Sequence, residues 1–356
     1  MKSILITGGA GFVGSSLAKL YKQTFPGIKV VAFDNLRRRG SEKNLKIFQD
    51  LGIDFVHGDV RQLDDLLDID QEFDLLIEAS AEPSVLAGVD GKGTRYLVQT
   101  NLMGTLNCLD FAKTHCKKVI FLSSSRVYSI DALRAVPLKE EETRLEVDSS
   151  KIKQTGLSHQ GIDHQFSTQD FRSLYGTTKL ASELFVEEYV RNFGMKIMIN
   201  RCGVIAGPGQ FGKVDQGVFT MWVARHLFKK SLKYIGFNGT GKQVRDLLHI
   251  KDLFDLLQLQ VPSLDKHNFG LYNVGGGRVS HTSLLEYTKI CQRLSGNTID
   301  IAQDKQTTSV DIPWYISDNT KATHTFNWVP KRSAEVLAQD IFLWLKENEN
   351  ELRHLF

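Results

Sequence analysis

A tyrosine and a lysine four residues apart, Tyr175 and Lys179 in the segment YGTTK, form a pair that could carry acid–base chemistry. The segment begins a helical run over 175–192, where residues four apart share one side of a helix. A lysine ammonium close to a phenol favours the phenolate, which can take a proton from a hydroxyl group. The alternative is an ordinary solvated helix face, so the neighbouring motifs must separate the two interpretations.

A serine-rich stretch, SSSRVYS, ends the apolar run over 118–124. In open parallel sheets, ligands bind outside the carboxyl ends of the strands, which is where these serines lie. We predict that the Ser124 hydroxyl hydrogen-bonds the oxygen that reacts. The alternative is that Ser123, Ser124 and Ser125 cap or turn the chain, and we expect one or two of them to do so.

The segment ITGGAGFVG contains the spacing Gly9-x-Gly11-x-x-Gly14, and Gly8 with Gly11 and Gly14 gives a second regular spacing. Such glycines allow a tight turn, close approach of the backbone to a pyrophosphate and close helix–strand packing. The helix that follows offers its N–H groups and the positive end of its dipole. The loop therefore predicts a dinucleotide site, with a plain strand–helix turn as the alternative.

Asp34 lies twenty residues after Gly14, at the end of the second apolar run. A carboxylate there accepts hydrogen bonds from both adenosine ribose hydroxyls and repels a 2′-phosphate, so it favours NAD over NADP. The three arginines at 37–39 could serve a 2′-phosphate, but we expect them to stack on adenine or face water. Asp59, after the third run, is expected either to meet the adenine amino group or to cap a helix.

Short, unbroken apolar runs carry these motifs. They predict strands over 3–7, 29–33, 53–57, 74–79 and 118–124. Helical spacing over 12–24 and 93–115 lies between them. Near-continuous apolar strands that alternate with helices indicate an α/β fold with a doubly wound parallel sheet, covered on both faces.

Beyond this region the pattern changes. Polar residues dominate 131–172, which we interpret as a surface excursion on the substrate side. The helix over 175–192 and a strand over 196–201 then continue the sheet. We expect the first domain to cover mainly 1–206, and glycine-rich loops between helices indicate a smaller C-terminal lobe over 207–356.

The bulk composition excludes several function classes. Net charge is +3 over 356 residues, which is too small to indicate nucleic acid or a membrane surface as a partner. No apolar stretch approaches the roughly 18 residues that span a bilayer, and we expect no secretory signal. The four cysteines form no CxxC pair, and His159 and His164 have no companions for a metal site. We expect a cytoplasmic protein with reduced cysteines and no metal.

From residue 1 to about 345, these motifs resemble the extended short-chain dehydrogenase/reductase family, in its NAD-dependent epimerase/dehydratase branch. The motifs that carry the resemblance are the glycine loop, Asp34-Asn35, Asp59-Val60, Asn101-x-x-Gly104-Thr105, the serine-rich strand end and YxxxK. The resemblance implies a Rossmann fold, NAD as cofactor, and Ser124, Tyr175 and Lys179 as catalytic residues. It implies for NAD binding the residues Gly8, Gly11, Phe12, Val13, Gly14, Asp34, Asn35, Leu36, Arg38, Asp59, Val60, Ala79, Ser80, Ala81, Asn101, Tyr175, Lys179 and Cys202.

Later motifs narrow the resemblance. GKQVRD and GPGQFGKVDQ resemble the CDP-paratose (CDP-tyvelose) 2-epimerase group of that family, whose substrates are nucleotide-diphosphate sugars. Arg245 would then bind the diphosphate through bidentate hydrogen bonds, with an ion pair to Asp246 or Asp252 as the alternative. The residues implied for substrate binding, in the C-terminal lobe and beside the catalytic serine, are Ser125, Arg126, Gln210, Asp215, Gln216, Gln243, Arg245 and Arg278.

The chain departs from the family at several positions. Glu78 stands where members often have histidine, Val204 replaces an asparagine and Gly209 replaces an arginine. The segment VDIPWYISD lacks the arginine that is usual there, a place that Arg278 could fill.

The reaction implied by the resemblance is a redox-neutral epimerisation. Ser125-Arg126 stands where the dehydratases of the family have Asp-Glu, and elimination of water needs those carboxylates. We expect inversion at C2 of the sugar. The alternatives are a UDP-hexose 4-epimerase, another NAD-dependent nucleotide-sugar dehydratase or reductase, and a catalytically silent NAD-binding protein. The family also implies a homodimer or higher homo-oligomer through helices near 93–115 and 175–192.

Overall fold

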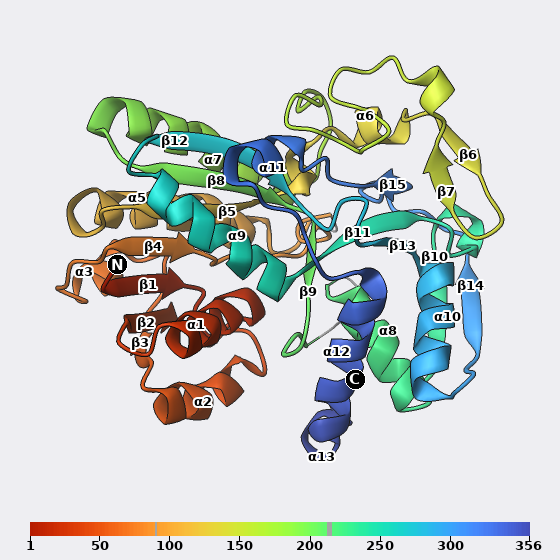
Figure 1. Cartoon of the computed structure of the whole chain (residues 1–356), viewed down its shortest axis with the longest axis horizontal. Helices are drawn as coiled ribbons and strands as arrows, with labels where there is room; N and C mark the ends of the chain where they lie inside the picture. The colour runs from red at the N-terminus through yellow and green to blue at the C-terminus, as the bar shows by residue number, and fades with distance from the viewer. Residues whose placement is uncertain (90, 212–215) are drawn as a thin grey trace. The chain divides into compact units, whose positions relative to one another are not determined.

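A computed structural model describes residues 1–89, 91–211 and 216–356 of the chain. Its internal contacts divide it into two compact units (Figure 1). The first unit consists of Met1–Val127, Leu174–Arg201 and Leu253–Tyr272, and the second of Tyr128–Ser173, Cys202–Asp252 and Asn273–Phe356. Each unit is therefore assembled from segments that are far apart in the sequence.

The first unit is built on a seven-stranded sheet with the strand order β12-β8-β5-β4-β1-β2-β3 (Figure 1). Strand β1 pairs in parallel with β2 and β4, β2 with β3, and β4 with β5. The strands are β1 Ser3–Thr7, β2 Lys29–Asp34, β3 Asp54–His57, β4 Leu75–Glu78, β5 Val119–Ser124, β8 Ile197–Cys202 and β12 Phe269–Val274. The six strands expected before residue 203 agree to within one residue at each end, so the doubly wound α/β fold is confirmed.

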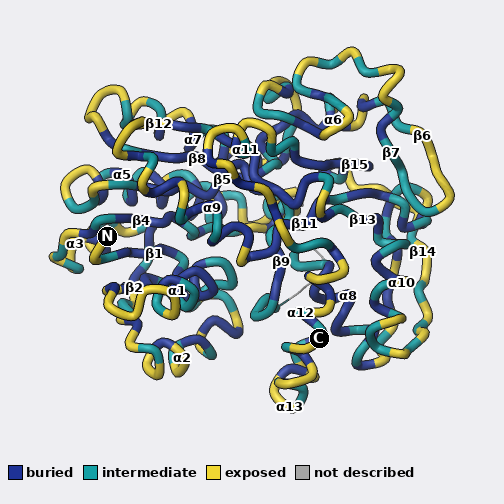
Figure 2. The backbone as a smooth tube through the Cα atoms, in the orientation of Figure 1, coloured by how far each residue is buried: buried dark blue, intermediate teal, exposed yellow. Residues whose placement is uncertain are grey.

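Helices cover both faces of this sheet, whose strands, apart from the edge strand β3, are buried along most of their length (Figure 2). On one face, Leu5 and Leu76 share an apolar cluster with residues of α3, α5 and α7. On the other, Tyr21 of α1 packs edge-on against Phe254 of α9, with ring centroids 4.9 Å apart. The helices are α1 Phe12–Thr24, α2 Asn44–Leu51, α3 Leu63–Leu67, α4 Thr94–Val98, α5 Gly104–His115, α7 Leu174–Phe193 and α9 Ile250–Ser263.

The helix expected over 93–115 is not regular throughout, because a π-helical turn at Gln99–Met103 separates α4 from α5. The carbonyl of Asn101, within that turn, accepts hydrogen bonds from the hydroxyls of Thr105 (2.8 Å) and Ser182 (3.1 Å). In the wider turn, the backbone hydrogen bonds shift by one residue along the chain. The two hydroxyls donate to the carbonyl of Asn101, which this shift leaves accessible. The segment expected to be helical is thus helical from Thr94 to His115, with a π-helical turn within it.

The second unit has its own sheets and its own core. Strand β11 pairs antiparallel with β13 and parallel with β15 and β9, while β10 pairs in parallel with β14. Trp222, Tyr287 and Leu337 lie in one buried cluster, so the helices α8, α10 and α12 that carry them share a core. The elements are β9 Val204–Ala206, α8 Val218–Leu227, β10 Leu232–Ile235, β11 Val244–His249, β13 His281–Ser283, α10 Leu284–Ser295, β14 Ile301–Asp304, β15 Trp314–Tyr315, α11 Thr320–Phe326, α12 Ala334–Glu347 and α13 Glu349–Leu352.

The polar segment over 131–172 belongs to this second unit. It forms α6 Ile130–Arg134 and an antiparallel pair, β6 Leu138–Glu140 with β7 Leu145–Val147. The N–H of Leu145 donates to the carbonyl of Lys242, and the N–H of Ile162 donates to that of Ile316, both at 2.8 Å. Backbone hydrogen bonds thus anchor the segment to the rest of its unit.

A buried ion pair joins β5, α7 and β8 of the first unit. Both carboxylate oxygens of Glu183, on α7, lie 3.1 Å from Nε of Arg201 on β8, and a second guanidinium nitrogen lies 2.7 Å from one of them. Ser123, on β5, donates its hydroxyl to the same carboxylate at 2.5 Å. Three neighbouring elements therefore share one network of charge-assisted hydrogen bonds.

Arg201→Met should lower the free energy of unfolding by about 3–5 kcal/mol, since it leaves the Glu183 carboxylate buried without its partner. Urea unfolding measures the change. The matched control is Arg191→Met at an exposed position of α7, which should change stability by less than about 0.5 kcal/mol. Adding Glu183→Leu to Arg201→Met should recover most of the loss, because the unpaired charge is removed. Equal stability of the Arg201 and Arg191 variants would contradict the assignment.

Candidate active site

The glycine loop lies between β1 and α1, in close contact with the loop that follows β4. A side chain at Gly14 would place its Cβ 2.2 Å from the carbonyl oxygen of Gly8. Gly8 has a φ of 64°, and a Cβ there would lie 2.7 Å from the carbonyl oxygen of Ala79. Among the described residues, no side chain caps α1 at Gly11, so the N–H groups of its first turn are available to an anion.

Asp34 ends β2 and faces the same loop. Its carboxylate accepts hydrogen bonds from the N–H groups of Ala10 (3.1 Å) and Leu36 (2.7 Å). The second bond holds Leu36 at a φ of 54°, in the left-handed region that a leucine rarely adopts. Burial raises the pKa of Asp34, although these N–H groups oppose the shift. The carboxylate is thus fixed in place with lone pairs left for ribose hydroxyls.

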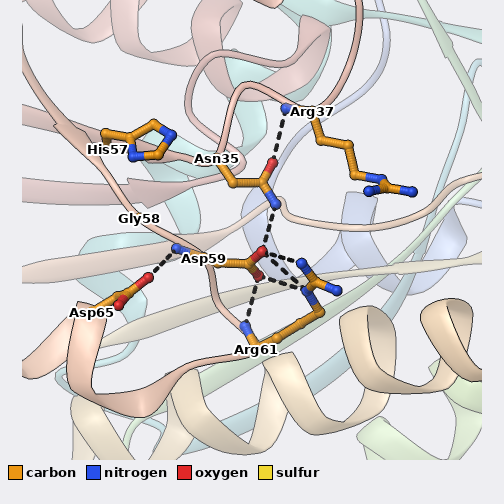
Figure 3. A pocket seen from close by; sticks show the side chains of 7 residues that line it. All are labelled: Asn35, Arg37, His57, Gly58, Asp59, Arg61 and Asp65. Carbon is orange, nitrogen blue, oxygen red and sulfur yellow. Dashed lines mark hydrogen bonds and ion pairs between the residues drawn. The ribbon is translucent and has the colours of Figure 1, made fainter.

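A hollow of about 400 Å³ lies at the ends of β2 and β3 (Figure 3). It is lined by Asn35, Arg37, His57, Gly58, Asp59, Arg61 and Asp65. The amide of Asn35 donates to Asp59 at 2.9 Å, and the Arg61 guanidinium binds the same carboxylate with contacts of 2.5–3.0 Å (Figure 3). Gln62 stands at the N-cap position of α3 without a capping side-chain hydrogen bond, so the alternative in which Asp59 caps this helix is wrong.

The charges around this hollow are paired. Burial opposes ionisation of Asp59, but the hydrogen bonds from Arg61 and Asn35 outweigh it and lower the pKa of Asp59 to about 2. The guanidinium groups of Arg37 and Arg61 lie 4.1 Å and 5.0 Å from the ring centroid of Tyr96 on α4. Arg37 is exposed, so it faces water, as one of the two expected alternatives has it, and it also lies against the ring of Tyr96.

Tyr175 and Lys179 lie one turn apart on α7, with exposed fractions of 9% and 2%. The interpretation of the pair as a solvated helix face is therefore wrong. The Lys179 ammonium donates to the carbonyl of Leu122 on β5 at 3.0 Å and lies 4.6 Å from the ring centroid of Phe121. Ser124, the last residue of β5, is buried, and its Oγ accepts a hydrogen bond from the N–H of Arg126 at 3.1 Å. The serine thus turns the chain, as one of the open alternatives proposed, at the strand end next to α7.

The remaining residues expected at the cofactor lie around this strand edge. Ala79, Ser80 and Ala81 follow β4 directly, and Cys202 ends β8. Asn101 is fully buried, and its side chain binds both the N–H (2.7 Å) and the carbonyl (3.1 Å) of Glu82. Asn101 therefore clamps the loop after β4 against the π-helical turn.

Two buried residues near the pair, Glu183 and Arg201, escaped the sequence analysis, and Glu78 was singled out there only as a departure from the family. Glu183 carried a signal, because it lies one helical turn after Lys179 and two turns after Tyr175, on the side of α7 that faces the sheet. Arg201 carried none, since only the placement of β8 brings it to Glu183.

Most residues expected to bind substrate lie in the second unit, where internal partners occupy their polar groups. Arg245 binds Asp311 (2.9 Å) and the carbonyl of Ile312 (2.6 Å), so an ion pair exists, but not with either aspartate that we had considered. Arg278 binds Glu146 at 3.1 Å.

The glutamines of this group differ in their partners. Gln210 binds the carbonyl of Ile205 and the hydroxyl of Thr220. The buried Oε1 of Gln243 has no hydrogen-bond partner among the described residues. Gln216 is partly buried, and Asp215 lies outside the described residues.

The residues of the first unit fit a dinucleotide. The open N-terminus of α1 suits a diphosphate, and Asp34 presents acceptors to a ribose. Nothing fits a metal, because no group of three or more His, Cys, Asp or Glu side chains within 1–89, 91–211 and 216–356 could hold one. No helix in those same ranges is long and apolar enough to cross a membrane.

Comparisons with known proteins agree with this chemistry. The profile of the NAD dependent epimerase/dehydratase family matches residues 4–275. CDP-paratose 2-epimerase of Salmonella typhi is 32% identical over 96% of this chain and 98% of its own length. UDP-glucose 4-epimerase 2 of Arabidopsis thaliana is 28% identical over 98% and 96%. The solved dTDP-glucose 4,6-dehydratase of Bacillus anthracis, in complex with NAD, has a TM-score of 0.74 at 24% identity over the full length of both chains, which shows a shared fold.

Asp59→Asn should remove a stabilisation that depends on pH. The folded-state pKa of about 2 lies below the unfolded value of about 3.9, so the wild type should keep its full advantage above pH 4 and lose it as pH falls toward 2. Partial solvation limits the advantage to about 1 kcal/mol. Urea unfolding of both proteins from pH 6 to pH 2 measures the difference. The exposed substitution Asp68→Asn is the control, and an advantage over Asp59→Asn that does not change with pH would contradict the ion-pair argument.

Proposed function

Because the chain belongs to the NAD-dependent epimerase/dehydratase family, we propose that it uses NAD to invert a hydroxyl-bearing carbon of a nucleotide-diphosphate sugar. The observation that carries the proposal is the burial of Tyr175 and Lys179 on α7, next to the strand end that bears Ser124. Ser125 and Arg126 follow that serine, so the carboxylates that a dehydratase needs there are missing from the sequence. This favours epimerisation over elimination.

In this mechanism Tyr175, as phenolate, removes the proton of the sugar hydroxyl while the carbon that bears it becomes a carbonyl. Bound NAD supplies a two-electron acceptor that takes hydride from the sugar and gives it back. Lys179, fixed by the carbonyl of Leu122, stabilises the phenolate. The Ser124 hydroxyl donates to the same sugar oxygen. Once the keto sugar has presented its other face, Tyr175 returns the proton, so the net redox change is zero.

The substrate is a CDP-sugar of the paratose/tyvelose type, inverted at C2. This rests on the GKQVRD motif and on the 32% identity to CDP-paratose 2-epimerase over nearly the whole chain. A UDP-hexose 4-epimerase is the second candidate, because an Arabidopsis enzyme of that name is 28% identical over a similar span. The same proton-transfer residues would serve both reactions, and only the sugar pocket would differ.

The second unit supplies the groups that recognise the nucleotide. Arg245 and Arg278 are the cations for the diphosphate, and each would exchange its internal carboxylate, Asp311 or Glu146, for phosphate oxygens. The buried Oε1 of Gln243 is an acceptor for a donor group of the nucleotide sugar. Gln210, Asp215 and Gln216 remain candidates for the base or sugar.

The function is tested by incubating the purified protein with CDP-paratose and, separately, with UDP-glucose, and following the products by NMR. We expect inversion of CDP-paratose without reduction of added NAD. Tyr175→Phe should retain bound NAD and lose about 10²–10⁴-fold in turnover. The matched control, Tyr189→Phe on the same helix, should keep its turnover.

Each other outcome identifies an alternative. Inversion of UDP-glucose alone indicates a 4-epimerase, and reduction of added NAD without inversion indicates a dehydrogenase. Absence of turnover despite bound NAD indicates a silent NAD-binding protein. Turnover by Tyr175→Phe at the wild-type rate would end the role that we give to this tyrosine.

We also propose that two copies associate through α7, where Leu184 and Phe185 are 59% and 42% exposed. Neighbouring large apolar side chains on one helix are costly in water and are typical of an interface. Leu184→Glu should convert a dimer to a monomer in size-exclusion chromatography with light scattering. Leu343→Glu, at an exposed position of α12, should leave the mass unchanged. A monomeric wild type at tens of micromolar would refute the proposal.

A further inference from the structure

Glu78 is a carboxyl group in the interior of the first unit that the proposed mechanism does not use. It ends β4 and is 1% exposed. In the sheet it lies in register with Thr7 of β1 and Phe121 of β5, so these three side chains point to the same face. That face is covered by α5 and α7, the helix that carries Tyr175 and Lys179.

The ammonium of Lys179 lies above the same row of the sheet. It sits 4.6 Å from the ring centroid of Phe121, the in-register neighbour of Glu78, and its positive charge acts on the Glu78 carboxyl. The other buried carboxylate nearby, Glu183, is already engaged by Arg201 and Ser123. A fully buried lysine is rare unless it is paired, and among the described residues Glu78 is the remaining buried carboxyl group on which the charge of Lys179 acts.

Polar but uncharged groups complete the surroundings of Glu78. The Ser80 hydroxyl donates to its carboxyl at 3.0 Å. Thr105 lies 3.5 Å away, but its single hydroxyl proton has the shorter contact, 2.8 Å, with the carbonyl of Asn101. The thiol of Cys108, on α5, stays neutral because burial raises its pKa well above the usual value. Among the described residues, Lys179 is thus the charged group that acts on Glu78.

We propose that Glu78 is a positioning residue that shares the charge of Lys179 with Tyr175 and thereby sets the pH at which Tyr175 becomes a phenolate. The inference rests on the proposed proton-transfer role of Tyr175 and Lys179. One ammonium serves two acid groups, and a negative Glu78 weakens its attraction for a phenolate. Burial raises the pKa of Glu78, and the charge of Lys179 opposes that shift.

The direction of the effect follows from the sign of the charges. Replacing Glu78 by a neutral side chain leaves the ammonium to Tyr175 alone, so the phenolate forms at lower pH. Removing a unit charge several ångströms away in a protein interior corresponds to a shift of about one pH unit. A purely structural role of Glu78 would change stability or turnover and leave this pH unchanged.

The test is the absorbance titration of tyrosinate in the NAD-bound protein with Glu78→Gln, measured as the difference between each protein and its Tyr175→Phe counterpart. We expect the midpoint of the Tyr175 signal to fall by about one pH unit relative to wild type. The acid limb of the pH–rate profile for sugar inversion should move in the same direction. Glu82→Gln, which neutralises a carboxylate four residues further along the chain, is the matched control and should leave the midpoint in place.

A second variant covers a failure of Glu78→Gln to fold. Glu78→Met has a similar volume and buries no polar group, and both hydroxyls near it have other acceptors, Thr7 for Ser80 and the Asn101 carbonyl for Thr105. It should lower the midpoint as well. An unchanged or raised midpoint in the folded variant overturns the inference. The titration needs no sugar, so a wild type without sugar turnover would refute the proposed function while Glu78 is still tested.

Discussion

An ammonium group that is removed from water must recover its lost solvation from the protein, at a cost of several kcal/mol if it does not. The first unit meets this constraint at Lys179 with three features of the sheet: a free carbonyl at Leu122, the face of the Phe121 ring, and a carboxyl group at Glu78. All three lie at the carboxyl end of β5 or beside it. Tyr175 lies one turn earlier on α7, on the same side of the helix as this ammonium, and a nearby positive charge favours the ionised form of an acid group. The proposed proton transfer at this edge of the sheet thus depends on how α7 packs against β5.

Much of this arrangement could be predicted from the sequence, for reasons that are local. Strands that are buried on both faces have unbroken apolar sequences, which can be recognised directly. Gly8 and Gly14 are required because a Cβ at either position would lie within a few ångströms of neighbouring backbone atoms. The pairing of Glu183 with Arg201 could not be predicted, because it depends on β8 lying beside β5. For the same reason, the sequence indicated that Arg245 needs an anion but not that Asp311, 66 residues away, provides one. The chemistry of a side chain is local, whereas its partner is a property of the fold.

The residues proposed for proton transfer and those proposed to bind the nucleotide lie mostly in different units, which the order of the sequence does not reveal. The residues proposed for proton transfer lie in the first unit, although 49 residues of chain that belong mostly to the second separate Ser124 from the helix that carries Tyr175. Most groups proposed to bind the nucleotide lie in the second unit. The two arginines among them, Arg245 and Arg278, are held by hydrogen bonds to Asp311 and Glu146 of the same unit. A change in the sugar or base could therefore arise by substitution in one unit without disturbing the other, which agrees with the different substrates named for the relatives of this chain.

The π-helical turn at Gln99–Met103 has a consequence for the lengths that this region can tolerate. Each residue in a helix turns the following ones by about 100°, so deletion of one residue here would restore a regular helix and rotate α4 relative to α5 by about that angle. Tyr96 would then leave the two guanidinium groups that lie against its ring, and the clamp made by Asn101 on the loop after β4 would open. The extra residue therefore sets the rotation of Tyr96, beside the hollow lined by Arg37 and Arg61, relative to α5. Insertions and deletions should be selected against between Thr94 and Thr105, even where substitutions are tolerated.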